Sequence, residues 1–425
     1  MRSVSDFVIP DSLVQGPTEC IGSARAVWKR FSGVEAFSRR RLAVLPWGMK
    51  ITVLGAGTVG TAVAVDLARS SETAHVQVCE AQPATLRTFR AAHTYPGLRT
   101  YEADARDAQA LEPILNGSTC VVSCVGPEHS PRLARLALDL GAHFVDLGNP
   151  LPDPALAEHA ERRQRWVVTG CGLAPGLVGV LAMRAVGAMD EARAVRIRVG
   201  DVPQEPREPF RHRLAHSAER LLDDYTEPAP VLVDGKIETR EPMTGVESVE
   251  VDGFGTMEAF YTGAGLGSLA EALEGRVASL DVKTIRHPGH AERMRFVLDL
   301  GLAERTSLDV RTHLTYRDVL VRRLRKRLGG DYDDAVLLRI EVDGTRDGAE
   351  GTLVYEMADR CDPETGLSAM QRCTGFPAAT AAVLLAARAL PGGGVGPADQ
   401  VLPIEPFMDR LAERGIAVHE RWVAA

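Results

Sequence analysis

The feature that most constrains this chain is a short apolar run that ends in Gly-x-Gly-x-x-Gly, at residues 50–60. The residues that follow have helical apolar spacing, and a second apolar run then ends at Glu80. Gly55 permits a tight turn, Gly57 lets a pyrophosphate approach the backbone, and Gly60 lets the helix pack closely on the strand. The motif therefore predicts a strand–turn–helix unit that binds a dinucleotide at the helix N-terminus.

The acidic residue after the second run indicates which dinucleotide binds. Glu80 lies 25 residues after Gly55, roughly where a carboxylate accepts hydrogen bonds from a ribose diol. The same carboxylate would repel a 2′-phosphate, so we expect NAD rather than NADP. Thr58 and Val59, which open the helix, belong to this expected cofactor site. Residues 263–268 are also glycine-rich but lack the third glycine, which indicates a turn at a sheet edge or a substrate-contacting loop.

Length and composition favour a two-domain soluble protein. The chain has 425 residues, of which 45% are hydrophobic and 25% charged, as in ordinary globular proteins. Its net charge of −8 argues against a dedicated nucleic-acid binder, and no window approaches the roughly 18 apolar residues of a membrane span. The seven cysteines form no CxxC pair, so we expect no metal site and free thiols in a reducing cytoplasm.

Residues 1–48 differ from the rest of the chain. They carry seven basic and four acidic residues, a net charge of +3, and they lack the apolar core of a signal peptide. Either Met49 is the natural start, or the segment is a genuine extension in which residues 24–43 could form a basic amphipathic helix. We expect it to be poorly ordered or packed against a partner subunit.

From residue 50 onward, apolar runs alternate with helical patterns, which predicts an α/β fold with a parallel, doubly wound sheet. Ligands bind beyond the carboxyl ends of the strands in such a sheet. Asp104 could contact adenine there, or cap the helix that begins near residue 107. The residues expected at these strand ends are Glu80, Asp104, Cys124, Val125, Gly126, Pro127 and Asp146.

After residue 170 the pattern changes. Short alternating runs with Asp-Gly turns, among them Asp343–Gly344, predict a mostly antiparallel α+β domain. An alanine-rich helix at residues 377–390 is expected to return to the first domain. The predicted organisation is an extension (1–48), a Rossmann-type NAD-binding domain (49–172, completed by 373–425), and a domain for substrate binding and oligomerisation (173–372).

Five sequence blocks carry a resemblance to a known enzyme family. They are VLGAGTVG at 53–60, VDLG at 145–148, GCGLAPGLVGVLA at 170–182, the paired blocks at 217–228 and 255–262, and KTIRHPGH at 283–290. The chain from Met49 onward resembles the saccharopine dehydrogenase-like oxidoreductases, and among them the lysine 6-dehydrogenases most closely. The resemblance implies a middle domain that forms a homo-oligomer, and NAD-linked chemistry at a carbon that bears nitrogen.

One segment departs from the family pattern. Where the lysine enzymes have aromatic and amide residues, this chain has RHRLAH at 211–216. Arg213, His212 and His216 in a substrate wall would suit a substrate with a second carboxylate. The two histidines lie four residues apart, but no further metal-binding pattern accompanies them, so we expect no metal.

The implied chemistry requires a general base. An amine must lose a proton before it can release a hydride, and water must then add to the imine, so a base must lie within hydrogen-bond reach. The candidates are Asp146, His290 and His129. Each has a structural alternative: a buried carboxylate that caps a loop, a packed histidine, and a solvated residue at a helix start.

A second group of residues could hold the substrate. Arg286 could bind a carboxylate, or form a surface ion pair. Pro175 opens a helix whose N–H groups could bind a carboxylate or the nicotinamide amide, or could serve the helix alone. Tyr225 and Tyr261 could contact substrate, although aromatic residues near a domain junction more often belong to the core.

Three functions remain open at this point. The first is NAD-dependent oxidation of the terminal amine of L-lysine or a close analogue, which gives 2-aminoadipate 6-semialdehyde that cyclises to an imine. The second is a reductive reaction, as in saccharopine or carboxynorspermidine formation. The third is a non-catalytic protein that binds NAD. The first is the leading hypothesis, with a small amino-acid substrate and no nucleic-acid or membrane partner.

Overall fold

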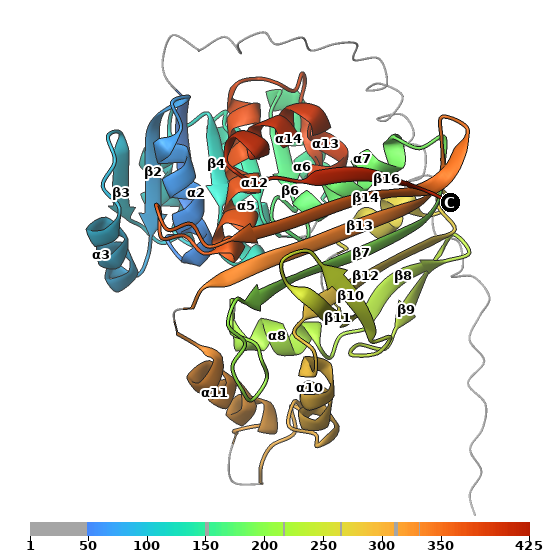
Figure 1. Ribbon diagram of the computed structural model, residues 1–425. Coiled ribbons are helices and arrows are strands. Elements are labelled where there is room, and N and C mark those ends of the chain that lie inside the picture. The colour runs from blue at the N-terminus through green and yellow to red at the C-terminus, as the bar shows by residue number, and fades with distance from the viewer. Residues whose placement is uncertain (1–48, 149–152, 216, 264–265, 310–312, 331) are drawn as a thin grey trace, which may run out of the picture. The chain divides into compact units, whose positions relative to one another are not determined.

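The computed structural model describes residues 49–148, 153–215, 217–263, 266–309, 313–330 and 332–425. The predicted extension over residues 1–48 and the candidate His216 lie outside these ranges. Within them, Figure 1 shows two sheets with helices packed against them. No helix in the described ranges is long and apolar enough to cross a membrane.

Seven parallel strands form the first sheet, in the order β15-β6-β5-β4-β1-β2-β3. The order reverses between β1 and β4, which is where ligands bind in open α/β sheets. This confirms the predicted Rossmann-type doubly wound sheet. The strands are β1 (Met49–Leu54), β2 (Thr73–Glu80), β3 (Leu98–Glu102), β4 (Cys120–Ser123), β5 (His143–Asp146), β6 (Trp166–Thr169) and β15 (Gly394–Pro397).

Helices cover both faces of the parallel sheet because alternate residues of each buried strand point to opposite sides. Val53 and Val122 pack among residues of α2, α7 and α12. Val121 and Phe144 pack among residues of α4, α5 and α6. The helices of this part are α2 (Thr58–Arg69), α3 (Pro83–Ala92), α4 (Ala108–Leu115), the short η1 (Pro127–His129), α5 (Ser130–Asp139), α6 (Pro154–Arg163), α7 (Leu177–Gly187), α12 (Ala369–Ala386), α13 (Ala398–Val401) and α14 (Ile404–Glu413).

The second sheet has nine strands, and its main path runs β10-β11-β12-β7-β13-β14-β16. Only β7 and β12 pair in parallel, so the predicted mostly antiparallel α+β part is confirmed. Its strands are β7 (Glu191–Pro203), β8 (Ala229–Val233), β9 (Lys236–Arg240), β10 (Glu247–Val251), β11 (Gly255–Tyr261), β12 (Ser279–Arg286), β13 (Asp334–Arg346), β14 (Ala349–Arg360) and β16 (His419–Ala424). Its helices are α8 (Ala218–Asp224), α9 (Leu269–Leu273), α10 (His290–Asp299) and α11 (Tyr316–Leu328).

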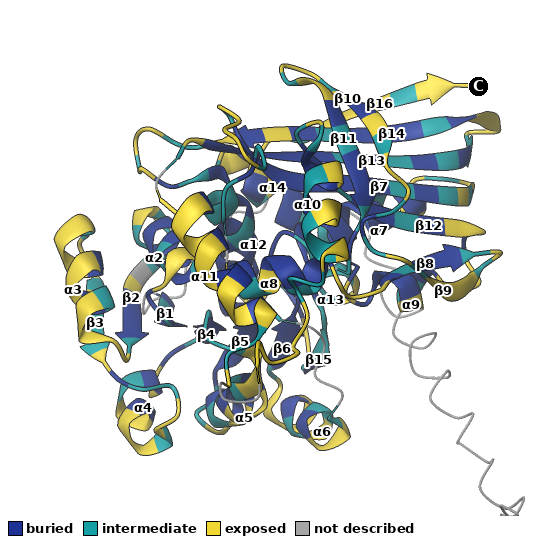
Figure 2. Cartoon of the chain, turned by 90° about the horizontal axis from the view of Figure 1, so that it is seen from below, coloured by how far each residue is buried: buried dark blue, intermediate teal, exposed yellow. Residues whose placement is uncertain are grey.

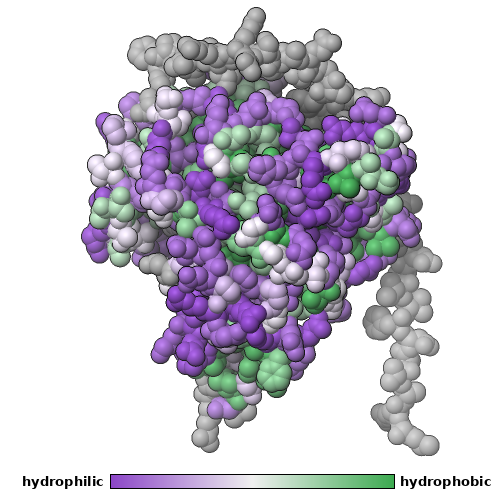
Figure 3. Space-filling model, viewed as in Figure 1, coloured by the Kyte–Doolittle hydropathy of each residue, from purple (hydrophilic) through white to green (hydrophobic). Residues whose placement is uncertain are grey.

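Burial follows this arrangement. Figure 2 shows mostly buried residues along β7 and β13, whereas α3 and α11 carry long exposed stretches. In Figure 3 apolar colour gathers at the lower end, which is the region of α10 and α11 in Figure 1. Exposed large apolar residues there include Phe296, Leu300 and Val319. Exposed apolar surface of this kind favours the predicted homo-oligomer, which stays a prediction.

The turn between β13 and β14 was predicted at Asp343–Gly344, and this is wrong. Both residues lie within β13, and the turn is formed by Asp347 and Gly348, which have φ values of 52° and 75°. A Cβ on Gly344 would lie 1.8 Å from the carbonyl oxygen of Glu191. The glycine is therefore required by close pairing with β7 rather than by a turn.

The C-terminal helix also begins earlier than predicted. The sequence favoured a start at Pro377, but α12 spans Ala369–Ala386 with this proline inside it. A capping box sets the start, because the Ser368 side chain accepts a hydrogen bond from a backbone N–H of the first turn. A Cβ on Gly375 would lie 2.7 Å from a side-chain atom of α2, so this glycine lets the two helices pack closely. Beyond α12, β15 joins the parallel sheet and β16 joins the second sheet.

Candidate active site

The glycine loop between β1 and α2 has the geometry that dinucleotide binding requires. Gly55 has a φ of +96°, which favours glycine. A Cβ on Gly60 would lie 1.9 Å from the Gly55 carbonyl oxygen, so close packing of the helix on the loop needs a glycine there. Nothing lies within 4 Å of a Cβ built on Gly57, so its backbone faces open space. The residues present therefore fit a pyrophosphate at the N-terminus of α2, which Thr58 and Val59 begin.

A cleft of about 360 Å³ adjoins this loop, and we call it the Glu80 cleft. The Glu80 Oε2 accepts a hydrogen bond from the Ala56 N–H at 2.8 Å, and Oε1 accepts one from the Gln82 N–H at 2.7 Å. Each oxygen keeps a second lone pair for a ribose hydroxyl. Glu80 thus stabilises the glycine loop through a hydrogen bond and also lines the cleft. Its predicted companions in the lining are Gly55, Asp104, Val125, Gly126 and His129.

Asp104 and His129 both lie at the Glu80 end of the site. Asp104 does not cap α4, because Asp107 does so by accepting two backbone hydrogen bonds. Hydrogen bonds from Arg106 lower the pKa of Asp104 to about 2. His129 lies 3.4 Å from a Glu128 carboxylate oxygen and lines the same cleft. A catalytic role for His129 therefore finds no support in its position, which is beside the expected adenosine.

The double role of Glu80 leads to a prediction. Replacing Glu80 with serine should weaken NADH binding about tenfold, because it removes the ribose acceptor and loosens the glycine loop. Loss of the carboxylate should also reduce the ratio by which the protein binds NADH more tightly than NADPH. Glu102 ends the neighbouring strand at the same level and does not line the cleft, so Glu102→Ser is the matched control. Fluorescence titration with both nucleotides measures the effect; an unchanged preference in Glu80→Ser would refute the assignment.

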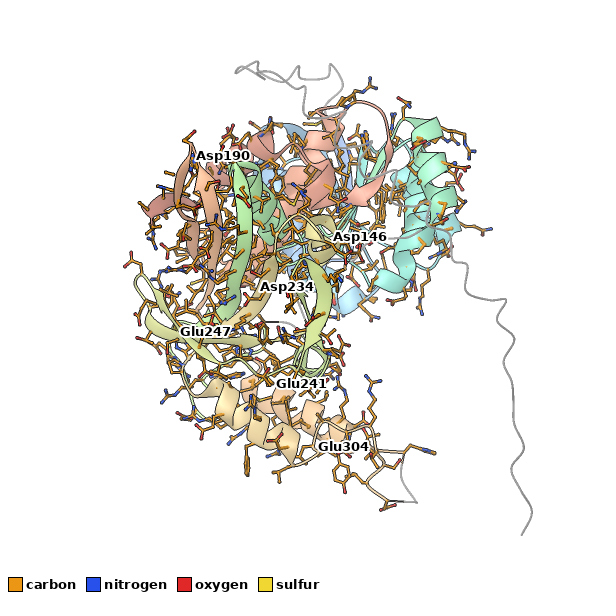
Figure 4. The ribbon with its side chains drawn as sticks, turned by 90° about the vertical axis from the view of Figure 1, so that its right-hand side faces the viewer. Asp146, Asp190, Asp234, Glu241, Glu247 and Glu304 are labelled. Carbon is orange, nitrogen blue, oxygen red and sulfur yellow. The ribbon has the colours of Figure 1, made fainter. Side chains whose placement is uncertain are left out.

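Asp146 occupies the carboxyl end of β5 and is only 3% exposed. Its Oδ1 accepts a hydrogen bond from the Gly148 N–H at 2.7 Å. Its backbone oxygen accepts one from Cys171 at 2.9 Å, which ties the end of β5 to the loop after β6. Burial raises the pKa of Asp146 above its ordinary value, against the opposing hydrogen bonds. Figure 4 places Asp146 within the outline of the ribbon, and its burial and raised pKa suit a general base.

Backbone contacts connect Asp146 to the glycine loop along the ligand edge. A Cβ on Gly148 would lie 3.3 Å from Asp146 Oδ1 and 3.4 Å from the Cβ of Pro127. A Cβ on Gly55 would lie 3.0 Å from the carbonyl oxygen of Cys124. The predicted residues after β4 and β5 are therefore neighbours of one another, as the edge rule for parallel sheets requires.

A small pocket lies further along this edge, and we call it the Asp399 pocket. It has a volume of about 10 Å³ and is lined in part by Pro175, Gly176, Ser268 and Asp399. The N–H groups of Leu177 and the following residue donate to carbonyls within the same turn, so the start of α7 largely caps itself. Fewer N–H groups near Pro175 are therefore left to bind an anion than the sequence predicted. Sequence reasoning missed Asp399, which follows a strand, β15, that was not predicted.

Three other predicted residues form a buried chain of hydrogen bonds, which we call the Arg286 network. The Arg286 Nε donates to the Tyr225 oxygen at 3.0 Å, and that hydroxyl lies 2.9 Å from His290 Nε2. His290 Nδ1 lies 2.7 Å from the Phe210 carbonyl oxygen, which can only accept, so Nδ1 carries the proton. Arg286 also pairs with Asp201 at 3.2 Å. All three side chains are buried and form hydrogen bonds with other groups of the protein, so the geometry favours a structural role.

The buried His290 leads to a prediction about acid stability. Burial, with the charge of Arg286 as the second cause, lowers its pKa to about 3 from 6.5. Between these values the unfolded chain takes up a proton and the folded chain does not, so the folded state becomes less stable as the pH decreases. Through this group, the free energy of unfolding should be about 3 kcal/mol lower at pH 4 than at pH 7.

The measurement is urea denaturation at both pH values. His290→Gln should be less stable than the wild type at pH 7, because its side chain restores the two hydrogen bonds of the imidazole imperfectly. Between pH 7 and pH 4, the free energy of unfolding of His290→Gln should decrease by less than that of the wild type. His419→Gln, at an exposed histidine in β16, is the control. An equal pH dependence in the wild type and His290→Gln would contradict the assignment.

The remaining predicted substrate residues lie elsewhere on the second sheet and its loops. The Tyr261 hydroxyl lies 3.4 Å from an Asp281 carboxylate oxygen, and its ring lies under the Lys283 ammonium. Arg213 donates a hydrogen bond to the Arg327 carbonyl oxygen, near the end of α11, at 3.3 Å. His212 is buried, with its ring 5.2 Å from that of His290. In the described ranges, no cluster of three His, Cys, Asp or Glu side chains could hold a metal ion.

Two family models match nearly the whole described chain. The model described as saccharopine dehydrogenase NADP binding domain matches residues 51–169, and the model described as saccharopine dehydrogenase C-terminal domain matches residues 172–416. The chain belongs to the saccharopine dehydrogenase family. As a member of this family it is an NAD(P)-dependent oxidoreductase. The predicted family resemblance is thus confirmed.

Two solved structures show the same fold. The saccharopine dehydrogenase (L-Glu forming) from Saccharomyces cerevisiae superposes with a TM-score of 0.74 at 18% identity, covering 89% of this chain and 100% of that one. The homospermidine synthase from Legionella pneumophila, in complex with NAD, gives a TM-score of 0.60 at 13% identity, covering 88% and 91%. At such identities the two structures support the saccharopine dehydrogenase fold and leave the substrate open.

Proposed function

We propose that this protein oxidises the terminal amine of L-lysine or a close analogue, with NAD as the cofactor. The product is 2-aminoadipate 6-semialdehyde, which cyclises to an imine. In the overall reaction lysine, water and NAD⁺ give the semialdehyde, ammonium, NADH and a proton. The observation that carries the proposal is Asp146, a buried carboxylate with a raised pKa at the end of β5, between the glycine loop and the Asp399 pocket.

The residues of the site divide the work as follows. The glycine loop and Glu80 would hold the adenosine and pyrophosphate half of the cofactor, and Pro127 and Gly148 would line the site of its reactive half. Bound NAD supplies the acceptor for the hydride. Asp146 accepts the proton that the substrate ammonium must lose, and after the hydride has left it assists the addition of water to the imine. The buried setting keeps this carboxylate basic enough for both steps.

The reductive alternative depended on positive charge in residues 211–216. Arg211 pairs with Glu208 at 3.1 Å and donates to the Pro288 carbonyl oxygen, while Arg213 is directed to α11. A second-carboxylate site at these arginines therefore has no support in the geometry, and we favour the oxidative reaction on a substrate with one carboxylate.

A direct assay tests the proposal. Purified protein with NAD and L-lysine, L-ornithine or related terminal amines at alkaline pH should produce absorbance in the NADH band. Omission of the amine is the control. Absence of turnover with every amine, together with tight NAD binding, would instead support the non-catalytic alternative, and turnover only with a keto acid, an amine and reduced cofactor would support the reductive one.

A further inference from the structure

The Asp399 pocket contains a carboxylate that the mechanism above does not use. Asp399 lies in the first turn of α13, two residues after the end of β15, at the same sheet edge as Asp146. The Ser268 hydroxyl donates to it, at 3.1 Å from Oδ1 and 3.4 Å from Oδ2. Burial raises the pKa of Asp399. A carboxylate held at this depth is stabilised when a cation approaches it.

No cation of the chain occupies that position. In the described ranges, no Lys, Arg or His lines the pocket, and no cation contributes to the pKa shift of Asp399. Instead, glycines let the backbone pack closely around the pocket. A Cβ on Gly179 would lie 3.0 Å from the Asp399 Cβ, and a Cβ on Gly176 would lie 2.1 Å from a backbone oxygen. The volume of about 10 Å³ suits one group the size of a water molecule or an ammonium ion.

The position of the pocket relative to Asp146 indicates which ammonium it could hold. β5 and β15 are separated by β6 alone, and neighbouring strands lie about 4.8 Å apart, so the two strand ends are roughly 10 Å apart. A straight-chain diamino acid carries its two amines at opposite ends of an aliphatic chain of comparable reach. The terminal amine must become neutral to react, whereas the α-ammonium stays charged and needs an anionic partner.

We infer that Asp399, held by Ser268, binds the α-ammonium of the amino-acid substrate while the terminal amine reacts at Asp146. This inference rests on the proposed function and adds the residue that selects an α-amino acid over a simple amine. It assigns to the C-terminal segment a direct part in substrate choice, because Asp399 lies in the first turn of α13.

The test compares two substrates that differ only in the inferred contact. 6-Aminohexanoate has the carboxylate and terminal amine of lysine but lacks the α-ammonium. Asp399→Asn should raise KM for lysine about tenfold or more, with kcat little changed, and should leave KM for 6-aminohexanoate within about twofold. Ser268→Ala should shift KM for lysine in the same direction by less. Glu271→Gln, at an exposed carboxylate of α9, should leave both values unchanged.

Two outcomes would overturn the inference: an equal rise of KM for both substrates in Asp399→Asn, which indicates a structural role, or no change of KM for either substrate. The proposed function fails separately, if the wild type oxidises neither compound. Calorimetric titration of the protein–NADH complex with each compound then decides the role of Asp399. Weaker binding of lysine alone in Asp399→Asn supports it, and equal changes for both compounds overturn it.

Discussion

Replacing Asp146 with asparagine is expected to lower kcat for amine oxidation by about 10²- to 10⁴-fold. The asparagine oxygen can still accept the hydrogen bond of the Gly148 N–H, which holds the loop at 2.7 Å in the wild type. The substitution therefore removes the proton acceptor and leaves the geometry of the loop unchanged. NADH affinity should stay within about twofold, because the glycine loop and Glu80 carry cofactor binding.

The pH profile gives an independent test of the same residue. Burial raises the pKa of Asp146, and only the ionised carboxylate can accept a proton. Thus kcat/KM of the wild type should fall as the pH drops through this raised pKa, and Asp146→Asn should lose that limb. Since a raised carboxyl pKa means that ionisation costs the folded state stability, the variant should unfold at the same or a higher temperature.

A matched control is Asp139→Asn, at an exposed carboxylate at the end of α5. It should keep the wild-type kcat and pH profile. If Asp146→Asn kept more than a tenth of the wild-type kcat, the base would have to be another group.

The second large effect concerns Arg286. Replacing it with methionine should reduce the free energy of unfolding by about 3–5 kcal/mol, because Asp201 would stay buried without its counter-charge. Arg286 and Asp201 are only 5% and 6% exposed in their side chains, and the guanidinium lies 3.2 Å from the Asp201 carboxylate. Burial alone would lower the pKa of Arg286, but Tyr225 and Asp201 raise it overall, so the guanidinium stays charged.

A double substitution separates the structural role from substrate binding. Adding Asp201→Asn to Arg286→Met removes both charges, and it should recover part of the lost stability in urea denaturation. Folded Arg286→Met should keep a KM for lysine close to that of the wild type. A normal stability with a large rise in KM would contradict the structural assignment and restore Arg286 as a carboxylate-binding residue.

Sequence patterns were most informative where local physics determines the structure. The spacing of Gly55, Gly57 and Gly60 predicted the turn and its helix, because each glycine answers a steric demand of the local backbone. The end of β5 placed Asp146 at the ligand edge, because the edge rule needs only strand order and direction. The family blocks predicted the fold of the whole chain after residue 48, which the family models confirm.

The patterns were less informative where distant segments meet. Arg286, Tyr225 and His290 come from three separate elements, and only tertiary packing decides that they satisfy one another in the interior. Asp399 was missed because β15 is a short glycine-rich strand without an apolar alternation. Gly344 was mistaken for a turn residue because glycine occurs both in turns and at positions where two strands pair too closely for a Cβ. Homo-oligomerisation and a cytoplasmic location stay predictions.

In the proposed reaction, hydride passes from the terminal carbon of the amine to NAD. Lysine deuterated at that carbon, with mass analysis of the reduced cofactor, tests this transfer. We expect one deuterium in the NADH formed by the wild type, and about 10²- to 10⁴-fold less labelled NADH per unit time with Asp146→Asn. Unlabelled NADH, or label transfer at the wild-type rate in Asp146→Asn, would contradict the proposal.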